Sequence, residues 1–258
     1  MKNLRVTLIQ SAIEWHNIDS NILHFRSLIS DIENKTDLII LPEMFTTGFT
    51  MNPVAIAEEM NGEAVSAIKE WSSTSGADIT GSIIVKEDNR YYNRLIWVKP
   101  DGEIFTYDKR HLFRMAGEEK VYSPGNSHLT VNLHGWRIRP FICYDLRFPV
   151  WTRNTGTEYD LALFTANWPA ARETHWDTLL RARAIENQCY IAGINRTGID
   201  GNGVNYNGKS SMIDFYGNIL FQADEKECIQ TMELSYDELT GYRESFPAWM
   251  DSDRFQLI

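Results

Sequence analysis

Residues 140–149 have the sequence PFICYDLRFP. The apolar residues before Cys143 are typical of a buried strand, and the Asp, Arg and Pro after it indicate a turn that leads into a helix. This pattern places the Cys143 thiol at the end of a strand, where open α/β sheets carry their reactive groups. Cysteine is also one of the most often buried residue types, so its position alone is compatible with a core residue as well as with a nucleophile.

The chain of 258 residues is long enough to bury a large core and to form one α/β domain. Its hydrophobic content of 43% and charged content of 23% are typical of globular proteins, and no apolar segment is long enough to span a bilayer. The first ten residues lack the apolar core and the cleavage site of a signal peptide. We therefore expect a cytoplasmic protein that is not bound to a membrane.

Charge and cysteine content narrow the classes of partner. A formal net charge of −10 opposes non-specific binding to nucleic acid or to anionic lipid. Three cysteines, Cys143, Cys189 and Cys228, form no CxxC pair, and the six histidines show no metal-ligand spacing. We expect a small-molecule substrate, no metal ion and no cofactor.

Strand-like and helix-like segments alternate along the whole chain without a linker, which predicts a sheet core covered by helices. Residues 38–41 are apolar throughout, as in a strand that is buried on both faces. In the predicted helix 173–187, Trp176, Leu179, Leu180 and Ile185 are expected to face inward. The predicted strands are 4–9, 38–41, 83–85, 95–98, 103–107, 139–143, 161–165, 190–194, 211–215 and 219–221; helices are predicted at 20–34, 64–71, after Pro149 and at 173–187, and a loop at 198–208.

Two further reactive side chains also lie just past predicted strands. Glu43 follows the strand 38–41, and Lys109 follows the strand 103–107. Each residue alone is equally compatible with a solvated surface charge. Together with Cys143, however, they occupy three strand ends, which can converge on one crevice.

The chemistry of these three residue types is complementary. A thiol with a pKa of about 8.5 is mostly protonated at neutral pH, so it needs a base or a positive field to act as a nucleophile. Glu43 can accept the proton if burial raises its pKa, and Lys109 can stabilise the negative charge that develops on a carbonyl oxygen.

Three segments, LPE at 41–43, KRHL at 109–112 and CYDLRFP at 143–149, resemble in order and separation the signatures of the nitrilase (carbon–nitrogen hydrolase) superfamily. The similarity extends to residues 183–188, 195–196 and 200–201, and therefore covers nearly the whole chain. The resemblance implies a four-layer α-β-β-α sandwich in a single carbon–nitrogen hydrolase domain over residues 1–258. It also implies a catalytic triad of Glu43, Lys109 and Cys143, and pairing with a second subunit as a homodimer.

The residues after the cysteine indicate which branch of the superfamily the chain resembles. True nitrilases tend to have Trp and Glu there, and carbamoylases tend to have Asn, whereas this chain has Tyr144 and Asp145. With YDKRHLF at 107–113 and ANWP at 166–169, the chain is similar to bacterial ω-amidases, which remove the terminal amide of 2-oxo-dicarboxylic acid monoamides such as 2-oxoglutaramate. The alternative is a related hydrolase that acts on another small amide or on a nitrile.

Other residues are candidates for supporting roles. Many superfamily members have a second glutamate in the loop after the lysine, which the resemblance places at Glu118, with Glu119 as the alternative. The backbone N–H of Tyr144 is expected to stabilise the oxyanion together with Lys109.

Candidate pocket residues include three aromatic side chains. Phe45 and Phe49 follow Glu43, and Asn167 with Trp168 follows the strand 161–165, so each can line a pocket or pack in the core. Arg147 can bind a substrate carboxylate, or it can form a salt bridge with Asp145 or another nearby acid.

Two rival functions remain at this stage. A Cys-His hydrolase would use His111 or His175 as its base, and a binding module would have kept the fold without catalysis.

The C-terminal segment predicts an interface. Its apolar residues lie among charged ones around Pro247, so they need another surface to cover them, either on a second copy or on the same subunit. These residues are Phe246, Trp249, Met250, Phe255 and Leu257.

Overall fold

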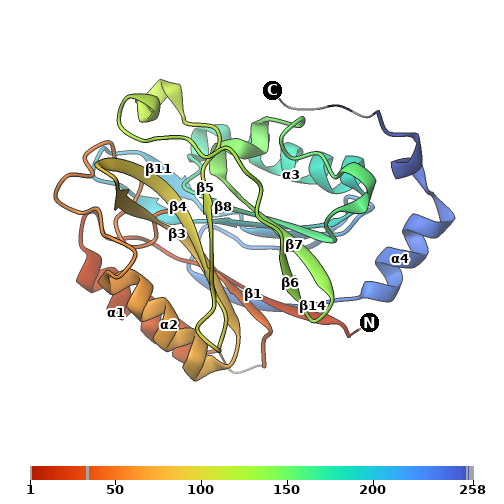
Figure 1. Ribbon diagram of the computed structural model, residues 1–258, viewed down its shortest axis with the longest axis horizontal. Helices are drawn as coiled ribbons and strands as arrows, with labels where there is room; N and C mark the ends of the chain where they lie inside the picture. The colour runs from red at the N-terminus through yellow and green to blue at the C-terminus, as the bar shows by residue number, and fades with distance from the viewer. Residues whose placement is uncertain (1, 33–34, 254, 256–258) are drawn as a thin grey trace.

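The computed structural model describes residues 2–32, 35–253 and 255, and it shows two mixed β-sheets packed face to face (Figure 1). The first sheet has the strand order β14-β1-β2-β3-β4-β5, and the second has the order β13-β12-β9-β8-β7-β6. The strands of the first sheet are β1 (Leu4–Gln10), β2 (Leu38–Ile40), β3 (Asp78–Glu87), β4 (Arg90–Val98), β5 (Ile104–Asp108) and β14 (Cys228–Leu234). Those of the second are β6 (Val131–Leu133), β7 (Trp136–Ile142), β8 (Leu161–Ala166), β9 (Tyr190–Asn195), β12 (Ser211–Ile213) and β13 (Ile219–Gln222).

The main core lies between the two sheets. Successive side chains of a strand point to opposite faces, so the apolar strand β2 contributes to two cores. Leu38 and Ile40 pack in the same cluster as Phe141 of the second sheet, whereas Ile39 packs on the other face with the helices. This two-faced burial explains why β2 has no polar alternation.

Helices cover the outer faces of both sheets, which completes the α-β-β-α sandwich (Figure 1). Helices α1 (Ile18–Ser30) and α2 (Glu63–Ser75) pack on the first sheet through residues such as Phe25 and Ile68. Helix α3 (Glu173–Asn187) packs on the second sheet, where Gly193 of β9 leaves room for it: a Cβ there would lie 2.6 Å from Leu180. The single-domain sandwich predicted from the sequence is confirmed.

The predicted strands overlap the observed ones, and the predicted helix 173–187 coincides with α3. The helix predicted after Pro149 is wrong, because residues 149–152 form turns and only a short 3₁₀ helix, Thr155–Thr157, follows. Here the backbone N–H groups of Trp151 and Thr152 both donate to the Phe148 carbonyl oxygen (3.1 and 3.2 Å), and the backbone N–H of Asn154 donates to Oδ1 of Asn187 (2.9 Å), so a tertiary bond replaces the next helical one. Ile185 was expected to face inward, but it is 50% exposed.

Segments outside the two sheets complete the fold. Part of the expected loop 198–208 forms a separate hairpin of β10 (Thr197–Ile199) and β11 (Asn205–Asn207). Helix α4 (Tyr236–Ser245) and strand β14 were not predicted; β14 pairs antiparallel with β1. No helix within the described ranges is long and apolar enough to cross a membrane.

Candidate active site

The ends of three strands bring Glu43, Lys109 and Cys143 to one place. Glu43 lies just past β2, Lys109 directly follows β5, and Cys143 directly follows β7. All three side chains are buried, with exposed fractions of 0%, 1% and 9%. Glu43 and Lys109 come from the first sheet and Cys143 comes from the second, so the cluster lies where the two sheets meet.

Lys109 is the centre of this cluster. Its Nζ donates to Oε1 of Glu43 over 2.9 Å and to both carboxylate oxygens of Glu118 over 3.0 Å. Burial lowers the pKa of Lys109, but the negative charges of Glu118 and Glu43 outweigh burial and raise the pKa above its ordinary value. The ammonium group therefore stays charged throughout the neutral range.

The Glu43 carboxylate is held in a fixed orientation. Its Oε1 accepts a hydrogen bond from Nδ2 of Asn93 over 2.7 Å, in addition to the one from Lys109. Its Oε2 accepts the backbone N–H of Asn167 over 2.8 Å, and Nδ2 of Asn167 donates to the Glu43 carbonyl oxygen over 2.6 Å. These bonds orient a buried charged group that would otherwise be costly.

Of the two candidates for the second glutamate, Glu118 contacts Lys109. Its side chain is fully buried, and its Oε2 also accepts the backbone N–H of Phe113 over 2.5 Å. Burial raises the pKa of Glu118, and the positive charge of Lys109 partly offsets this effect. Glu119 is instead partly exposed, and its nearest cation is Arg114 at 3.9 Å.

Cys143 begins a 3₁₀ helix, Cys143–Arg147, in a left-handed backbone conformation with φ of 43°. Such a conformation costs about 1–3 kcal/mol for a residue other than glycine, so the surroundings must hold it. The buried Asp145 carboxylate does so by accepting the backbone N–H groups of Ile142 (3.1 Å) and His111 (2.9 Å) and the hydroxyl of Tyr107 (2.7 Å). The hydrogen bonds of Asp145 therefore fix the turn that carries the thiol.

The environment of Cys143 favours the protonated thiol. Burial raises the pKa of Cys143, the Glu43 carboxylate raises it further, and Lys109 lowers it only in part. Its Sγ lies 3.8 Å from the carbonyl oxygen of Asn167. A group held as a thiol requires a base before it can attack a substrate, and Glu43 is the carboxylate in contact with it.

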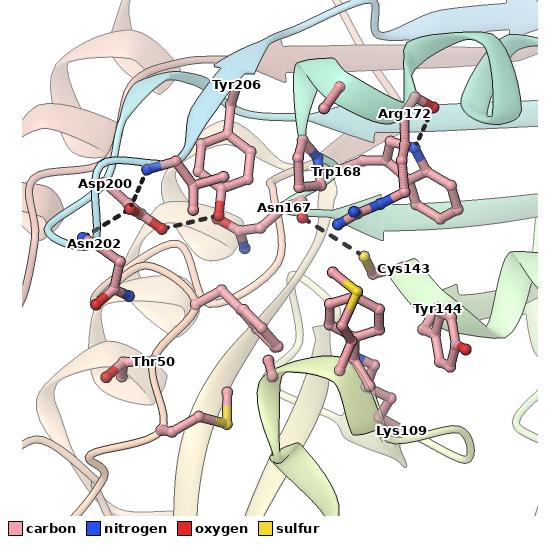
Figure 2. A pocket seen from close by; sticks show the side chains of 18 of the residues that line it. Thr50, Lys109, Cys143, Tyr144, Asn167, Trp168, Arg172, Asp200, Asn202 and Tyr206 are labelled. Atoms are coloured by element: carbon pink, nitrogen blue, oxygen red, sulfur yellow. Dashed lines mark hydrogen bonds between the residues drawn. The ribbon is translucent and has the colours of Figure 1, made fainter.

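A cavity of about 670 Å³ opens above Cys143 and Lys109 (Figure 2). Asn167, Trp168 and Arg147, which were candidates for substrate binding, line it. Several lining residues were not predicted, although Phe113 and Asp200 lie in segments that resemble the family. They include Met51, Phe113, Arg172, Asp200, Asn202 and Tyr206.

Phe45 was expected at the mouth of the pocket, and this prediction is wrong. Its side chain is fully buried in the core beneath α1 and α2, with its ring centroid 5.3 Å from that of Phe25 and 6.2 Å from that of Trp71. The backbone after Glu43 turns Phe45 toward the helices. Phe49, four residues further on, lines the cavity and lies with its ring 5.0 Å from Lys109 Nζ.

Arg147 does not form the expected salt bridge with Asp145. The Asp145 carboxylate is already occupied by the groups described above, and Arg147 lies elsewhere: its Nη2 bonds Nδ1 of His175 over 2.9 Å, and its guanidinium lies 4.8 Å from the ring centre of Trp168. The guanidinium thus remains on the cavity wall.

Neither histidine of the rival Cys-His scheme lines the cavity. His111 bonds Asp145 through Nδ1 over 2.8 Å and stacks on Phe148 at 3.7 Å, and His175 contacts Arg147. Within the described residues, no group of three or more His, Cys, Asp or Glu side chains could hold a metal ion.

The sandwich fold and the sequence together define the class of this protein. The family model described as "Carbon-nitrogen hydrolase" matches residues 5–244, and the chain belongs to this family. Among curated relatives, omega-amidase YafV of Yersinia enterocolitica is 49% identical and that of Escherichia coli strain K12 is 46% identical, each over 100% of both chains. A 2-oxoglutaramate amidase of Bacillus subtilis is 34% identical over 95% of this chain and 96% of its own.

Solved structures agree with this assignment. XC1258 from Xanthomonas campestris, a CN-hydrolase superfamily protein, is 43% identical with a TM-score of 0.98 over 100% of both chains. Nit3 of Saccharomyces cerevisiae, a member of branch 10 of the nitrilase superfamily, is 23% identical with a TM-score of 0.86 over 95% of both chains, and so shares the fold. The predicted resemblance to the ω-amidase branch of the nitrilase superfamily is confirmed.

Proposed function

We propose that this protein is an amidase that hydrolyses the terminal amide of small 2-oxo acid monoamides of the 2-oxoglutaramate type to the acid and ammonia. One observation carries the proposal: a buried ammonium, Lys109, is held between Glu43 and Glu118 beside the Cys143 thiol at the floor of a cavity. The relatives named omega-amidase and 2-oxoglutaramate amidase support the substrate class.

In the first half-reaction, Glu43 accepts the proton of Cys143 and the thiolate attacks the amide carbon. The oxyanion that forms accepts hydrogen bonds from Lys109 Nζ and from the backbone N–H of Tyr144, which lines the cavity in the first turn of a 3₁₀ helix, where N–H groups lack partners within the helix. As the C–N bond breaks, Glu43 returns its proton to the nitrogen. Ammonia leaves, and the acyl group stays on sulfur as a thioester.

In the second half-reaction, water replaces ammonia. Glu43 takes a proton from the water while the water oxygen attacks the thioester carbon. Lys109 Nζ and the backbone N–H of Tyr144 stabilise the new oxyanion. The C–S bond then breaks, the thiolate recovers a proton from Glu43, and the acid leaves. One carboxylate thus serves as base and acid in both steps.

Glu118 acts through Lys109 and is a positioning residue. With one carboxylate on each side, the ammonium cannot move entirely toward Glu43, which leaves Glu43 able to accept a proton. Because both oxygens of Glu118 bond Lys109 at 3.0 Å, the position of Nζ is fixed before the substrate arrives.

We propose that Arg147 binds the substrate carboxylate and that Trp168 and Phe49 contact the carbon chain, since all three line the cavity. Ammonia release from a panel of 2-oxo acid monoamides, simple amides, nitriles and N-carbamoyl compounds tests the function. We expect turnover of the 2-oxo acid monoamides. Hydrolysis confined to nitriles or carbamoyl compounds would contradict the proposal and support the alternative of a different superfamily hydrolase.

We also propose a cytoplasmic homodimer that pairs through an apolar patch in which Phe246 of the C-terminal segment lies with Ile185, Tyr216 and Tyr242. The rings of Tyr216 and Tyr242 are tilted against each other with centroids 4.5 Å apart, and the centroid of Phe246 lies 6.2 Å from that of Tyr242. The exposed fractions of Ile185, Tyr216 and Phe246 are 50%, 58% and 57%. Contiguous exposed apolar surface of this kind is typical of an interface. Light scattering at micromolar concentration should give the dimer mass, and Phe246→Asp should reduce it to the monomer mass.

The rest of the C-terminal segment is partly held by its own subunit. Gln188 bonds the backbone of both Phe246 (2.7 Å) and Trp249 (3.0 Å), which fixes the start of this segment against the end of α3. Met250 and Phe255 remain 65% and 48% exposed. Leu257 lies outside the described residues. If light scattering gives the monomer mass for the unmodified protein, the proposed homodimer is wrong.

A further inference from the structure

Four charged residues line the cavity: Lys109, Arg147, Arg172 and Asp200. The charge of Lys109 is balanced by Glu43 and Glu118, as described above. The Asp200 carboxylate is engaged within its own hairpin. Its Oδ1 accepts the backbone N–H groups of Asn202 (2.8 Å) and Val204 (3.0 Å), and its Oδ2 accepts the hydroxyl of Tyr206 (3.0 Å). Both oxygens of Asp200 thus hold the hairpin rather than a guanidinium group of the cavity wall.

Neither arginine forms an ion pair with a carboxylate of the described residues, although the chain carries a net charge of −10. Their contacts are with groups that carry no negative charge: His175 and Trp168 for Arg147, and for Arg172 the ring of Phe113, whose centre is 5.3 Å away. Both arginines also lie beside Trp168: the guanidinium of Arg147 is 4.8 Å from its ring centre, and the carbonyl oxygen of Arg172 accepts its Nε1–H over 2.8 Å. Burial lowers the pKa of Arg147, and the positive charge of Arg172 lowers it further.

Like charges held near each other repel, so an anion bound between the two guanidinium groups would relieve an unfavourable interaction. Each is fixed by its own local structure. Arg147 ends the 3₁₀ helix that begins at Cys143, and Arg172 ends a second 3₁₀ helix, Ala170–Arg172, whose last carbonyl oxygen accepts Nε1–H of Trp168 over 2.8 Å. Figure 2 shows Arg172 and Trp168 together on one side of the cavity, near Cys143.

We infer that Arg172 is a second substrate-binding residue, which together with Arg147 binds the carboxylate end of the substrate and selects anionic monoamides over neutral amides. The inference rests on the proposed amidase function. A 2-oxo acid end offers three acceptor oxygens, two on the carboxylate and one on the adjacent carbonyl. One guanidinium can bind the carboxylate through two parallel hydrogen bonds, and the second supplies donors for the remaining oxygen.

A neutral amide would leave both guanidinium groups without an anion in a partly desolvated wall. A site built to hydrogen-bond a substrate group can discriminate in kcat/KM against an analogue without that group by as much as roughly 10⁴-fold. The contact lies at the end of the substrate remote from the reacting carbon. Its loss therefore removes binding that is shared by the ground state and the transition state, which raises KM and leaves kcat nearly unchanged.

The test compares Arg172→Met, Arg172→Lys and the control Arg26→Met, which replaces an exposed arginine paired with Glu70 on the far helices. With 2-oxoglutaramate, we expect Arg172→Met to raise KM at least about tenfold with kcat within about threefold, which corresponds to the loss of one charged hydrogen bond. Hydrolysis of a neutral amide of similar length should be unchanged. Arg172→Lys should recover part of the loss, and Arg26→Met should behave as the unmodified enzyme.

A second measurement does not depend on turnover. 2-Oxoglutarate should protect Cys143 from iodoacetamide in the unmodified protein, and Arg172→Met should need at least about tenfold more of it for the same protection. If the unmodified enzyme hydrolyses 2-oxoglutaramate but Arg172→Met keeps the same KM and the same protection, the inference fails while the function stands. If no 2-oxo acid amide is hydrolysed, the function fails, and Arg172-dependent protection alone would still support an anion site.

Discussion

The backbone N–H of Asn167 donates to Oε2 of Glu43 over 2.8 Å, although the two residues are 124 positions apart. Glu43 follows a strand of the first sheet and Asn167 follows a strand of the second. The bond therefore joins the two halves of the sandwich at the proposed base. Because the thiol also comes from the second sheet, the distance between Glu43 and Cys143 depends on how the sheets dock.

Replacing Cys143 should abolish turnover while the fold stays intact. Cys143→Ser carries a hydroxyl whose pKa is too high for Glu43 to remove its proton, and Cys143→Ala has no nucleophile. We expect ammonia release at background level with an unchanged circular dichroism spectrum. Cys228→Ser, a partly exposed control, should remain active. Loss of activity in the control with an intact fold would show that Cys143 is not the sole nucleophile.

Lys109→Arg should lower kcat by at least about a hundredfold, the loss expected when one oxyanion donor is removed. The planar guanidinium has a different shape from the ammonium, which is enclosed by Glu43 and Glu118. Steady-state kinetics measure the effect, with the exposed Lys120→Arg as the control. A kcat near that of the unmodified enzyme would rule out a catalytic role for Lys109.

Glu118→Gln and Glu119→Gln separate the two candidate glutamates. Removing the charge of Glu118 takes away one of the two carboxylates that hold Lys109, so the ammonium should shift toward Glu43 and kcat should fall about tenfold or more, the size of a lost charged hydrogen bond. Glu119→Gln should have nearly normal kcat. Equal losses in the two variants would mean that the loop as a whole, rather than Glu118, is required.

The raised pKa of Cys143 predicts how its alkylation depends on pH. Only the thiolate reacts, so the rate with iodoacetamide should still be rising above pH of about 8.5, the ordinary thiol pKa. Glu43→Gln removes the negative charge that raises this pKa, so the pKa should fall and labelling at pH 8 should become faster even though turnover is lost. A rate that levels off below neutral pH would indicate a resting thiolate paired with Lys109.

Asp145→Ala should destabilise the protein by roughly 3 kcal/mol, because it leaves several buried donors without an acceptor. Urea unfolding measures the loss, and Asp31→Ala, at an exposed position, should change the stability little. The turn at Cys143 should also loosen, so kcat should fall. Unchanged stability would mean that other contacts hold the left-handed turn.

Glu43, Lys109 and Cys143 could be predicted as candidates because each follows a strand, where α/β sheets present their reactive groups. That two of them come from one sheet and the third from the other could not be predicted, because it depends on how the two sheets dock. The pairing of β14 with β1 could not be predicted, because it joins Leu4 to Leu234 and depends on contacts that no local pattern encodes. The direction of side chains also could not be predicted from the sequence. Phe45 and Phe49 have the same chemistry, and only the backbone between them sends one to the core and the other to the cavity.

The β10–β11 hairpin belongs to neither large sheet, yet it supplies Asp200, Asn202 and Tyr206 to the cavity wall. A change in its length or sequence would reshape the space around the acyl group without removing any hydrogen bond between Glu43, Lys109 and Glu118. Substitutions in this hairpin can therefore change the substrate preference, while the reacting residues stay unchanged at the strand ends. Exchanging the hairpin between related enzymes is accordingly a direct route to engineered amidases with new acyl preferences.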